Sequence, residues 1–246
     1  MKVELYNGTI CLDFNESQHR YTIDGNDIDG VTSVLNIINK PELNDWKVRT
    51  SLEYLVDEIL KQRSLSKGEL TNLSFKARVR GDVIANIASE QGTDIHQFIE
   101  DYIKGNQLPF DLESVEDTRL KSFKKFIDDW TPQFEECERV IYSKKYKYCG
   151  TLDFTARIDN KLYLGDFKSS KALRIHNNFQ TAAYQYAYEE ETGKKIDGRM
   201  IVRLDRSGIP EVVTTTDRKK DFDAFKSALI LLRRINELKH EHSNKS

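Results

Sequence analysis

The chain has 246 residues, of which 38% are hydrophobic and 32% are charged, so it is neither disordered nor fibrous and suits one large domain or a core with a helical subdomain. No apolar run approaches the roughly 20 residues that cross a bilayer, and no signal-peptide core opens the chain, so we expect no membrane partner and a cytoplasmic location in a bacterial or phage-infected cell. The net charge of −2 excludes a uniformly basic surface but allows basic residues confined to one groove.

Strand and turn signals occupy the first thirty residues. Short apolar runs at Val3–Tyr6, Ile10–Phe14 and Tyr21–Ile23 are punctuated by Asn7-Gly8 and Asp24-Gly25, which are hairpin dipeptides. We therefore expect a small N-terminal β-hairpin region over residues 1–30.

Helical spacing follows over residues 31–133. Thr32 or Ser33 can cap a short helix that Lys40-Pro41 ends, and a second helix runs from about Leu43 to Gln62. The polar, glycine-containing stretch 64–74 is interpreted as a loop. One helix or two then cover 75–103, and another covers 115–130 before Thr131-Pro132.

From residue 134 the pattern changes to strands. Three consecutive strands are predicted at 140–142, 150–158 and 162–167, with Asp159-Asn160 turning between the last two. A helix over 176–191 ends near Gly193, strands at 200–204 and 212–215 follow, and a helix closes the chain. The elements predict an α+β fold with a mixed central sheet flanked by helices, and the third region spans 134–246. One compact unit and two domains with a boundary near residue 133 both fit.

The strand pair around the Asp159-Asn160 turn carries the first candidate site. Alternation places Leu152, Phe154, Ala156 and Ile158 on one face and Asp153 on the other, while Asp166 and Lys168 share a face of the next strand. If the two strands pair, both carboxylates and the lysine converge. A cross-strand salt bridge between Asp153 and Lys168 on a solvated face is the alternative interpretation.

This combination suits phosphodiester hydrolysis. Two carboxylates can hold Mg²⁺ or Mn²⁺, which polarises a phosphoryl oxygen and lowers the pKa of a bound water. A neighbouring lysine can orient that water or stabilise the negative charge of the transition state. The main-chain carbonyl of Phe167, between Asp166 and Lys168, is a further candidate ligand.

Two helices offer partners for this site. His96 lies at the edge of an apolar helix face and could complete a metal shell, with Glu100 one turn later orienting its ring. Gln180 and Tyr184 share a face of the helix after the lysine strand and could reach the scissile phosphate. The alternatives are a core histidine and a tyrosine that fills core space.

Taken together and in order, four motifs resemble the PD-(D/E)xK nuclease superfamily, in its RecB-like branch. They are G-T-x-x-H at Gly92–His96, G-x-x-D at Gly150–Asp153, D-x-K at Asp166–Lys168 and Q-x-x-x-Y at Gln180–Tyr184. That branch includes the mitochondrial genome maintenance exonuclease and many phage exonucleases, and the similarity extends over residues 19 to 205, from His19 onward. The resemblance implies an α/β/α restriction-endonuclease-like core.

The resemblance also implies roles for individual residues. It makes His96, Asp153 and Asp166 metal ligands, Lys168 catalytic, and Gln180 and Tyr184 assistants near the substrate. Glu138 matches a recurrent acidic position of these enzymes and is carried over as a catalytic candidate, and Ser33, in the matching upstream segment, as a candidate DNA contact.

Cofactor motifs other than the metal site are missing from the sequence. Some members of the branch bind an iron–sulfur cluster through four cysteines, but Cys11, Cys137 and Cys149 are far apart and form no C-x-x-C pair. The sequence also lacks the G-x-x-x-x-G-K-[ST] phosphate loop. We therefore expect neither an iron–sulfur cluster nor a nucleotide cofactor.

Two basic clusters are candidate DNA-binding segments, because lysine and arginine pair with phosphates and aromatic rings stack on bases. They comprise Lys76, Arg78 and Arg80 in one stretch and Lys144, Lys145, Lys147 and Tyr148 in another. Ordinary solvated charge is the alternative meaning of such runs.

These observations favour a metal-dependent DNA exonuclease that trims free ends, with a preference for single strands, in repair, recombination or replication. DNA is the expected partner, with recombination or replication proteins as further ones. A structure-selective or nicking endonuclease with the same site is the second hypothesis. A non-catalytic DNA-binding module of a repair complex is the third.

Overall fold

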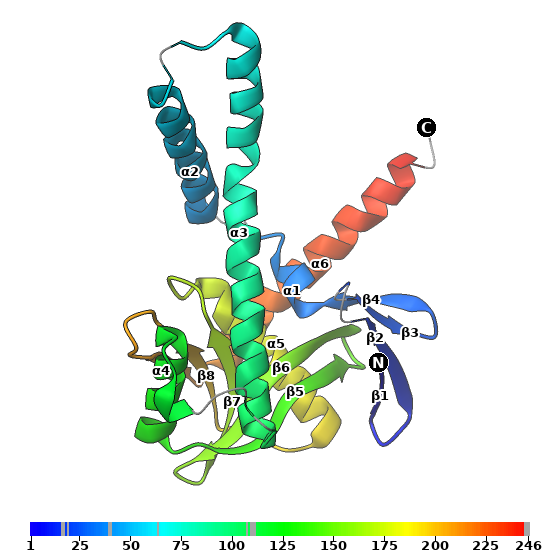
Figure 1. The fold of residues 1–246 in the computed structure, drawn as a ribbon. Helices are drawn as coiled ribbons and strands as arrows, with labels where there is room; N and C mark the ends of the chain where they lie inside the picture. Colours follow the sequence, from blue (N-terminus) through cyan, green and yellow to red (C-terminus); the bar gives the residue numbers. More distant parts are fainter. Residues whose placement is uncertain are drawn as a thin grey trace. The chain divides into compact units, whose positions relative to one another are not determined.

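A computed structural model describes residues 1–15, 18, 20–38, 41–62, 64–106, 108 and 112–243 (Figure 1). His19 and Lys40, which the sequence analysis used, lie outside the described residues. In the described part, nine strands form one mixed sheet accompanied by six α-helices, which confirms the α+β class. Contacts divide the chain into two compact units, Met1–Ile38 with Ile95–Ser246, and Asn39–Asp94. This division does not follow the composition change near residue 133.

Four short strands build the N-terminal region. β1 (Lys2–Leu5), β2 (Ile10–Asn15), β3 (Arg20–Ile23) and β4 (Asn26–Gly30) pair antiparallel in sequence order. Tyr6, Asn7 and Asp24 adopt positive φ at the turns, as hairpin turns require. The sequence did not predict β4, whose last residues pair in parallel with β6 and join this region to the main sheet.

The two helices after β4, α1 and α2, do not start where the sequence predicted. α1 (Val31–Leu35) starts directly after Gly30, which is its N-cap, so neither Thr32 nor Ser33 caps it. Pro41 does not end a helix; it is the first residue of α2 (Pro41–Leu60), a position where its fixed φ and missing N–H are tolerated.

The predicted loop over 64–74 is wrong, because α3 runs unbroken from Lys67 to Lys104. Its start is fixed by a capping box: the N–H and hydroxyl of Ser66 both donate to the Glu69 carboxylate, at 2.8 and 2.6 Å, and the Glu69 N–H donates back to Ser66 Oγ. The helix that carries His96 therefore begins at Lys67 and not near residue 75. None of the described helices is long and apolar enough to span a bilayer.

The second half of the chain contains the predicted elements, but the strand predicted at 140–142 is much longer and begins at Gln133. The elements are α4 (Thr118–Trp130), β5 (Gln133–Ser143), β6 (Tyr148–Ile158), β7 (Lys161–Lys168), α5 (Ile175–Thr192), β8 (Gly198–Arg203), β9 (Glu211–Thr215) and α6 (Arg218–Ser243), with a short 3-10 turn η1 (Leu112–Ser114) before α4. The sheet order is β1-β2-β3-β4-β6-β7-β8-β9, and β5 pairs with the other edge of β6. β7 and β8 are parallel and are connected by α5.

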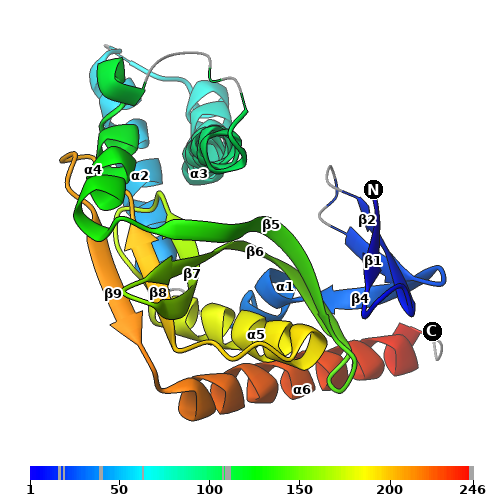
Figure 2. The same ribbon diagram turned by 90° about the horizontal axis from the view of Figure 1, so that it is seen from below.

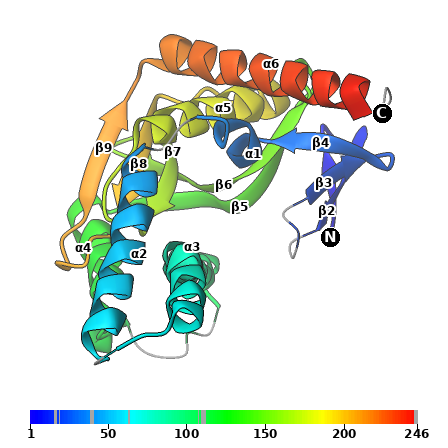
Figure 3. The same cartoon turned by 90° about the horizontal axis from the view of Figure 1, so that it is seen from above.

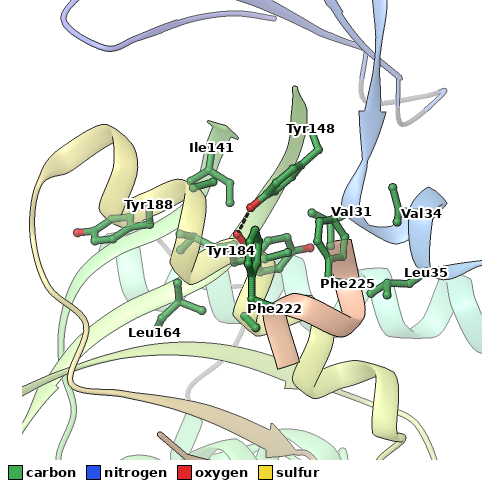
Figure 4. Close-up of a cluster of buried hydrophobic side chains, with 14 of the residues drawn as sticks. Val31, Val34, Leu35, Ile141, Tyr148, Leu164, Tyr184, Tyr188, Phe222 and Phe225 are labelled. Atoms are coloured by element: carbon green, nitrogen blue, oxygen red, sulfur yellow. Dashed lines mark hydrogen bonds between the residues drawn. The ribbon is translucent and has the colours of Figure 1, made fainter. Parts of the chain in front are cut away.

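Helices cover both faces of β5–β8 within the first unit (Figures 2 and 3). On one face α1, α5 and α6 pack on the sheet through a cluster that includes Leu152, Leu164, Tyr184 and Phe225 (Figure 4). On the other face α4 and the end of α3 pack through a cluster of Phe98, Phe123, Phe126, Phe154, Phe167 and Met200. The site described next lies where β6 and β7 separate between these two clusters.

Candidate metal centre

The candidate site begins where the β6–β7 ladder ends. Backbone pairing runs from Ile158 and Lys161 at the turn to Phe154 and Gly165, and does not continue among the described residues. Beyond that point the side chain of Asp153 takes the place of the ladder, because its Oδ2 accepts the N–H of Phe167 at 2.6 Å. In an extended strand the N–H and C=O of one residue point to the same edge, so the Phe167 carbonyl also faces β6, as its role as candidate ligand requires.

The predicted alternation along β6 breaks at Asp153. Leu152 packs in the cluster with α5, whereas Phe154, Ala156 and Ile158 pack in the cluster with α4, so these four residues do not share one face. β5 is distorted at the same level: Cys137 pairs with Phe154 and Arg139 with Leu152, and Glu138 between them has a φ of 47°. A left-handed glutamate inside a strand is strained by on the order of 1 kcal/mol or more, and such strain gathers at functional sites.

This distortion brings three side chains together. One ligand atom each from His96, Glu138 and Asp153 lies within 4.8 Å of the other two, and His96 Nδ1 is 3.7 Å from Asp153 Oδ2. His96 comes from the end of α3 that belongs to the first unit, Glu138 from β5 and Asp153 from β6. We predicted His96 and Asp153 as ligands; Glu138 was a catalytic candidate by resemblance, and its position makes it a third potential ligand.

Buried Asp166 and half-buried Lys168 form an ion pair beside this group. Lys168 Nζ lies 2.6 Å from Asp166 Oδ2, and the Asp166 side chain is 1% exposed. Neither carboxylate oxygen of Asp166 accepts a well-aligned hydrogen bond from any described residue. The pairing with Lys168 is therefore not the solvated cross-strand bridge to Asp153 that the sequence left open. The two Asp166 oxygens instead retain capacity for a further cation.

The carboxylates disfavour one another's ionisation. Burial, together with the charges of Asp153 and Glu100, raises the pKa of Glu138 to about 8. Burial also raises the pKa of Asp166, against the opposing charge of Lys168. Burial would lower the pKa of Lys168, but Asp166, Asp153 and Glu138 outweigh it, so the ammonium form is retained.

The donor set fits a hard divalent cation. Three carboxylates, one imidazole and a main-chain carbonyl are mainly oxygen ligands of the kind that Mg²⁺ and Mn²⁺ accept. Like charges placed opposite each other in a sheet destabilise it unless a positive charge compensates. The raised pKa values of Glu138 and Asp166 both indicate that Lys168 alone compensates incompletely.

Gln180 and Tyr184 lie next to the site on α5. The Gln180 side-chain amide donates to the Tyr184 hydroxyl at 2.9 Å, as their i,i+4 spacing predicted. The Tyr184 ring packs on Gly150, where an added Cβ would lie 2.7 Å from Cε1, so the glycine of the G-x-x-D motif makes room for this tyrosine. Tyr184 is 3% exposed, so it also fills core space.

Two neighbouring residues behave differently from expectation. Among the described residues Glu100 pairs with Lys104 one turn later, and the predicted orientation of the His96 ring by Glu100 is not seen. Tyr21, which sequence reasoning missed, shares a hydrogen bond of 3.0 Å with Thr151 Oγ1, two residues before Asp153. No local motif signals this contact, because β3 and β6 are far apart in the chain.

The candidate DNA-binding residues are scattered. Lys76, Arg78 and Arg80 are exposed on α3 in the unit Asn39–Asp94, and Ser33 is exposed on α1. Lys145 and Lys147 are exposed in the β5–β6 turn, and Lys144 lies 3.9 Å from the centre of the Tyr6 ring. That turn is on the order of 20 Å along β6 from Asp153 at about 3.3 Å per residue.

Tyr148 is not available for stacking on a base. Its side chain is fully buried, its hydroxyl donates to the Ala183 carbonyl at 2.7 Å, and its ring packs against Phe225 (Figure 4). The prediction that Tyr148 contacts DNA is therefore wrong. The tyrosine begins the β6 strand, where alternation directs it into the core under α5 and α6.

Replacing Glu138 with glutamine should stabilise the metal-free protein. Because the pKa of Glu138 is raised to about 8 in the folded protein, the fold disfavours the charged carboxylate. The protein therefore loses stability as pH rises from the ordinary glutamate range towards 8, and glutamine cannot acquire that charge. We expect a gain on the order of 1–3 kcal/mol near pH 8, seen as a higher Tm in the presence of a chelator. Glu116→Gln, at an exposed glutamate, should change stability by less than about 0.5 kcal/mol. A Glu138→Gln protein less stable than the parent under chelation would contradict the repulsion.

Comparisons with known proteins add little to this geometry. No model of a known protein family matches the chain, and no curated protein matches it. Among solved structures, the chain is similar to the crystal structure of SSO0001. The alignment covers 78% of this chain and 86% of that one, with 13% sequence identity and a TM-score of 0.35.

Proposed function

We propose that this chain is a divalent-metal-dependent DNA nuclease of the PD-(D/E)xK superfamily, in its RecB-like branch. The observation that carries the proposal is the convergence of His96, Glu138 and Asp153, with the ion pair of buried Asp166 and Lys168 beside them. A structural ion pair would need neither the strained φ of Glu138 nor a second and third carboxylate. The order of the four motifs in the sequence supports the same assignment.

The residues have distinct parts in the proposed reaction. Asp153, Asp166, Glu138, His96 and the Phe167 carbonyl would hold Mg²⁺ or Mn²⁺. The ion would polarise the phosphoryl oxygen and lower the pKa of a water molecule. Lys168, kept in its charged form by Asp166, would donate to the phosphate or to the attacking water and stabilise developing negative charge. Gln180 and Tyr184 would position the substrate from α5.

The substrate proposal is DNA with free ends, preferentially single-stranded, which the family resemblance supports. The test is digestion of end-labelled single- and double-stranded DNA in Mg²⁺ or Mn²⁺, with either end blocked and with circular single-stranded DNA as a parallel substrate. We expect linear single strands to be shortened from an end and circles to resist. Rapid linearisation of circles would favour an endonuclease. Binding without cleavage in either metal, unchanged by Asp166→Ala, would favour a non-catalytic DNA-binding module.

Metal binding should depend on pH in a defined direction. Because the pKa values of Glu138 and Asp166 are raised, these groups hold protons near neutral pH that a cation must displace. Mn²⁺ affinity should therefore increase from pH 6 to pH 8.5, by up to about tenfold per unit for each proton released. Calorimetry in buffers of different ionisation enthalpy measures the protons released. Glu138→Gln should release fewer, and an affinity independent of pH would count against these ligands.

A further inference from the structure

The candidate metal ligand Asp153 lies on a stretch of β6 that its neighbouring strands leave without full backbone pairing. On the edge away from β5, β4 pairs with β6 as far as Cys149, and β7 pairs from Phe154 onwards. Among the described residues no strand fills the gap over 150–153 on that edge. On the β5 edge the ladder continues on both sides of Asp153, but Asp153 and the left-handed Glu138 opposite it form no pair. Backbone pairing therefore does not fix the position of this ligand.

Two tyrosines hold this stretch from opposite faces of β6. An added Cβ at Gly150 would lie 2.7 Å from Cε1 of Tyr184, so Gly150 faces α5 and the tyrosine packs directly on it. Successive residues of a strand face opposite sides, so Thr151 faces away from α5. There its Oγ1 shares a hydrogen bond of 3.0 Å with the hydroxyl of Tyr21 on β3. The two contacts hold consecutive residues, and Asp153 follows two positions after the second.

Tyr21 is itself held in place by the N-terminal strands. Its side chain is 7% exposed, and its ring stacks on Phe14 of β2, with the centroids 4.6 Å apart and the planes 15° from parallel. The ring also packs against Gly30 of β4, where an added Cβ would lie 3.7 Å from Tyr21 Cε2. Because three strands of one small sheet fix the ring, its hydroxyl can hold Thr151 at a defined position.

The Tyr21 hydroxyl keeps its proton at neutral pH. Burial, with a smaller contribution from the charge of Glu138, raises the pKa of Tyr21 to about 12. A neutral phenol can donate to Thr151 Oγ1 without bringing a further negative charge to the carboxylates. Removing the Tyr21 hydroxyl therefore removes a contact near the candidate metal centre and leaves the charges of that centre unaltered.

We propose that Tyr21 is a positioning residue for the metal centre: by holding Thr151 it fixes the unpaired stretch of β6 and so places the Asp153 carboxylate for metal binding. The N-terminal strands then contribute to metal affinity, although none of the proposed ligands lies on them. This inference rests on the proposed function, because it takes Asp153 as a metal ligand. The alternative is a contact that only docks the N-terminal strands on the core, and the two differ in their effect on metal affinity.

Calorimetry of Mn²⁺ binding to the metal-free full chain tests the proposal. Tyr21→Phe keeps the stacked ring and removes its hydroxyl, whereas Thr151→Val keeps the branched shape and removes the other partner. Each should weaken Mn²⁺ binding about three- to tenfold, less than the roughly ten- to hundredfold loss that follows removal of a direct partner of a ligand. The double variant should lose no more affinity than either single variant, because all three lack the same hydrogen bond. Thr151→Ser, which keeps a hydroxyl, should lose less than Thr151→Val.

Tyr6→Phe is the matched control. The Tyr6 hydroxyl donates to the Tyr142 carbonyl at 2.9 Å, so it also ties the N-terminal region to β5. Tyr142 is four residues from Glu138, on the order of 13 Å along the strand. Both Tyr6→Phe and Tyr21→Phe should lower the Tm, but only Tyr21→Phe should weaken Mn²⁺ binding. Because Tyr21→Phe removes no charge, the number of protons released on metal binding should equal that of the parent.

The outcomes separate this inference from the proposed function. Parent-like Mn²⁺ affinity in both Tyr21→Phe and Thr151→Val overturns the inference and leaves the metal centre standing. Equal losses in Tyr6→Phe and Tyr21→Phe also overturn it, because a general loosening of the N-terminal region would then be the cause. A parent that binds no Mn²⁺ overturns the metal centre and the inference together. Weakened binding in Tyr21→Phe alone, beside a parent that cleaves no DNA, would support the inference and contradict the nuclease assignment.

Discussion

A Lys168→Met protein is expected to cleave DNA about a hundred- to a thousandfold more slowly than the parent at saturating Mn²⁺. Lys168 supplies the positive charge nearest the candidate metal ligands, and methionine keeps the length of the side chain without a donor. Its ammonium group is fixed by Asp166 at 2.6 Å, so little reorganisation is needed when charge develops on the phosphate. Single-turnover cleavage of end-labelled single-stranded DNA measures the loss directly.

If Lys168 had only a structural role, metal binding would be lost together with cleavage. Without the lysine, the buried Asp166 should take up a proton in the metal-free protein, because a lone charge in that position is strongly disfavoured. We therefore expect Mn²⁺ binding to survive in Lys168→Met at high pH, with the loss confined to the cleavage step. Lys161→Met, at an exposed lysine on the same strand, should cleave at the parent rate. Equal loss in both variants, or none in either, would remove Lys168 from the reaction.

Turns and helix ends that depend on the residues at that point of the chain were predictable from the sequence. Asp159 and Asn160 both adopt positive φ in the β6–β7 turn, and Gly193 ends α5 in the left-handed conformation. The pairing of β6 with β7 followed from that turn, and it brings Asp153 close to the Asp166 strand. His96 was also placed correctly on an inward-facing helix edge.

The rest depends on contacts that no local pattern encodes. The break in alternation at Asp153 coincides with the left-handed Glu138 on the neighbouring strand, and a glutamate gives no sign of such a φ. The S-x-x-E pattern of the Ser66–Glu69 capping box starts a helix within the stretch 64–74 that we predicted as a loop. Tyr148 was assigned to the surface from its basic neighbours, although its strand position directs it inward.

Gly165→Ala is expected to destabilise the protein by at least about 2–3 kcal/mol. A Cβ at this position would lie 1.9 Å from Cζ of Phe154, whose ring covers the glycine. The ring cannot swing away freely, because it packs at 4.6 Å from the ring of Phe167 and at 5.4 Å from that of Phe134, measured between centroids. Chemical denaturation of metal-free protein measures the change, and Gly30→Ala, where the new Cβ has no contact closer than 3.6 Å, should cost less than about 1 kcal/mol.

A double-mutant cycle separates the clash from a general intolerance of β7 to substitution. Phe154→Leu alone leaves a cavity and destabilises the protein, but it also removes the ring atoms that the new Cβ would meet. The Gly165→Ala/Phe154→Leu protein should therefore be more stable than the sum of the two single changes predicts, by on the order of 1 kcal/mol or more. Strict additivity would show that the glycine is required for backbone reasons. Because Gly165 directly precedes Asp166, a rescued fold should also regain Mn²⁺ binding, which would link the Phe154 ring to the position of the metal ligand.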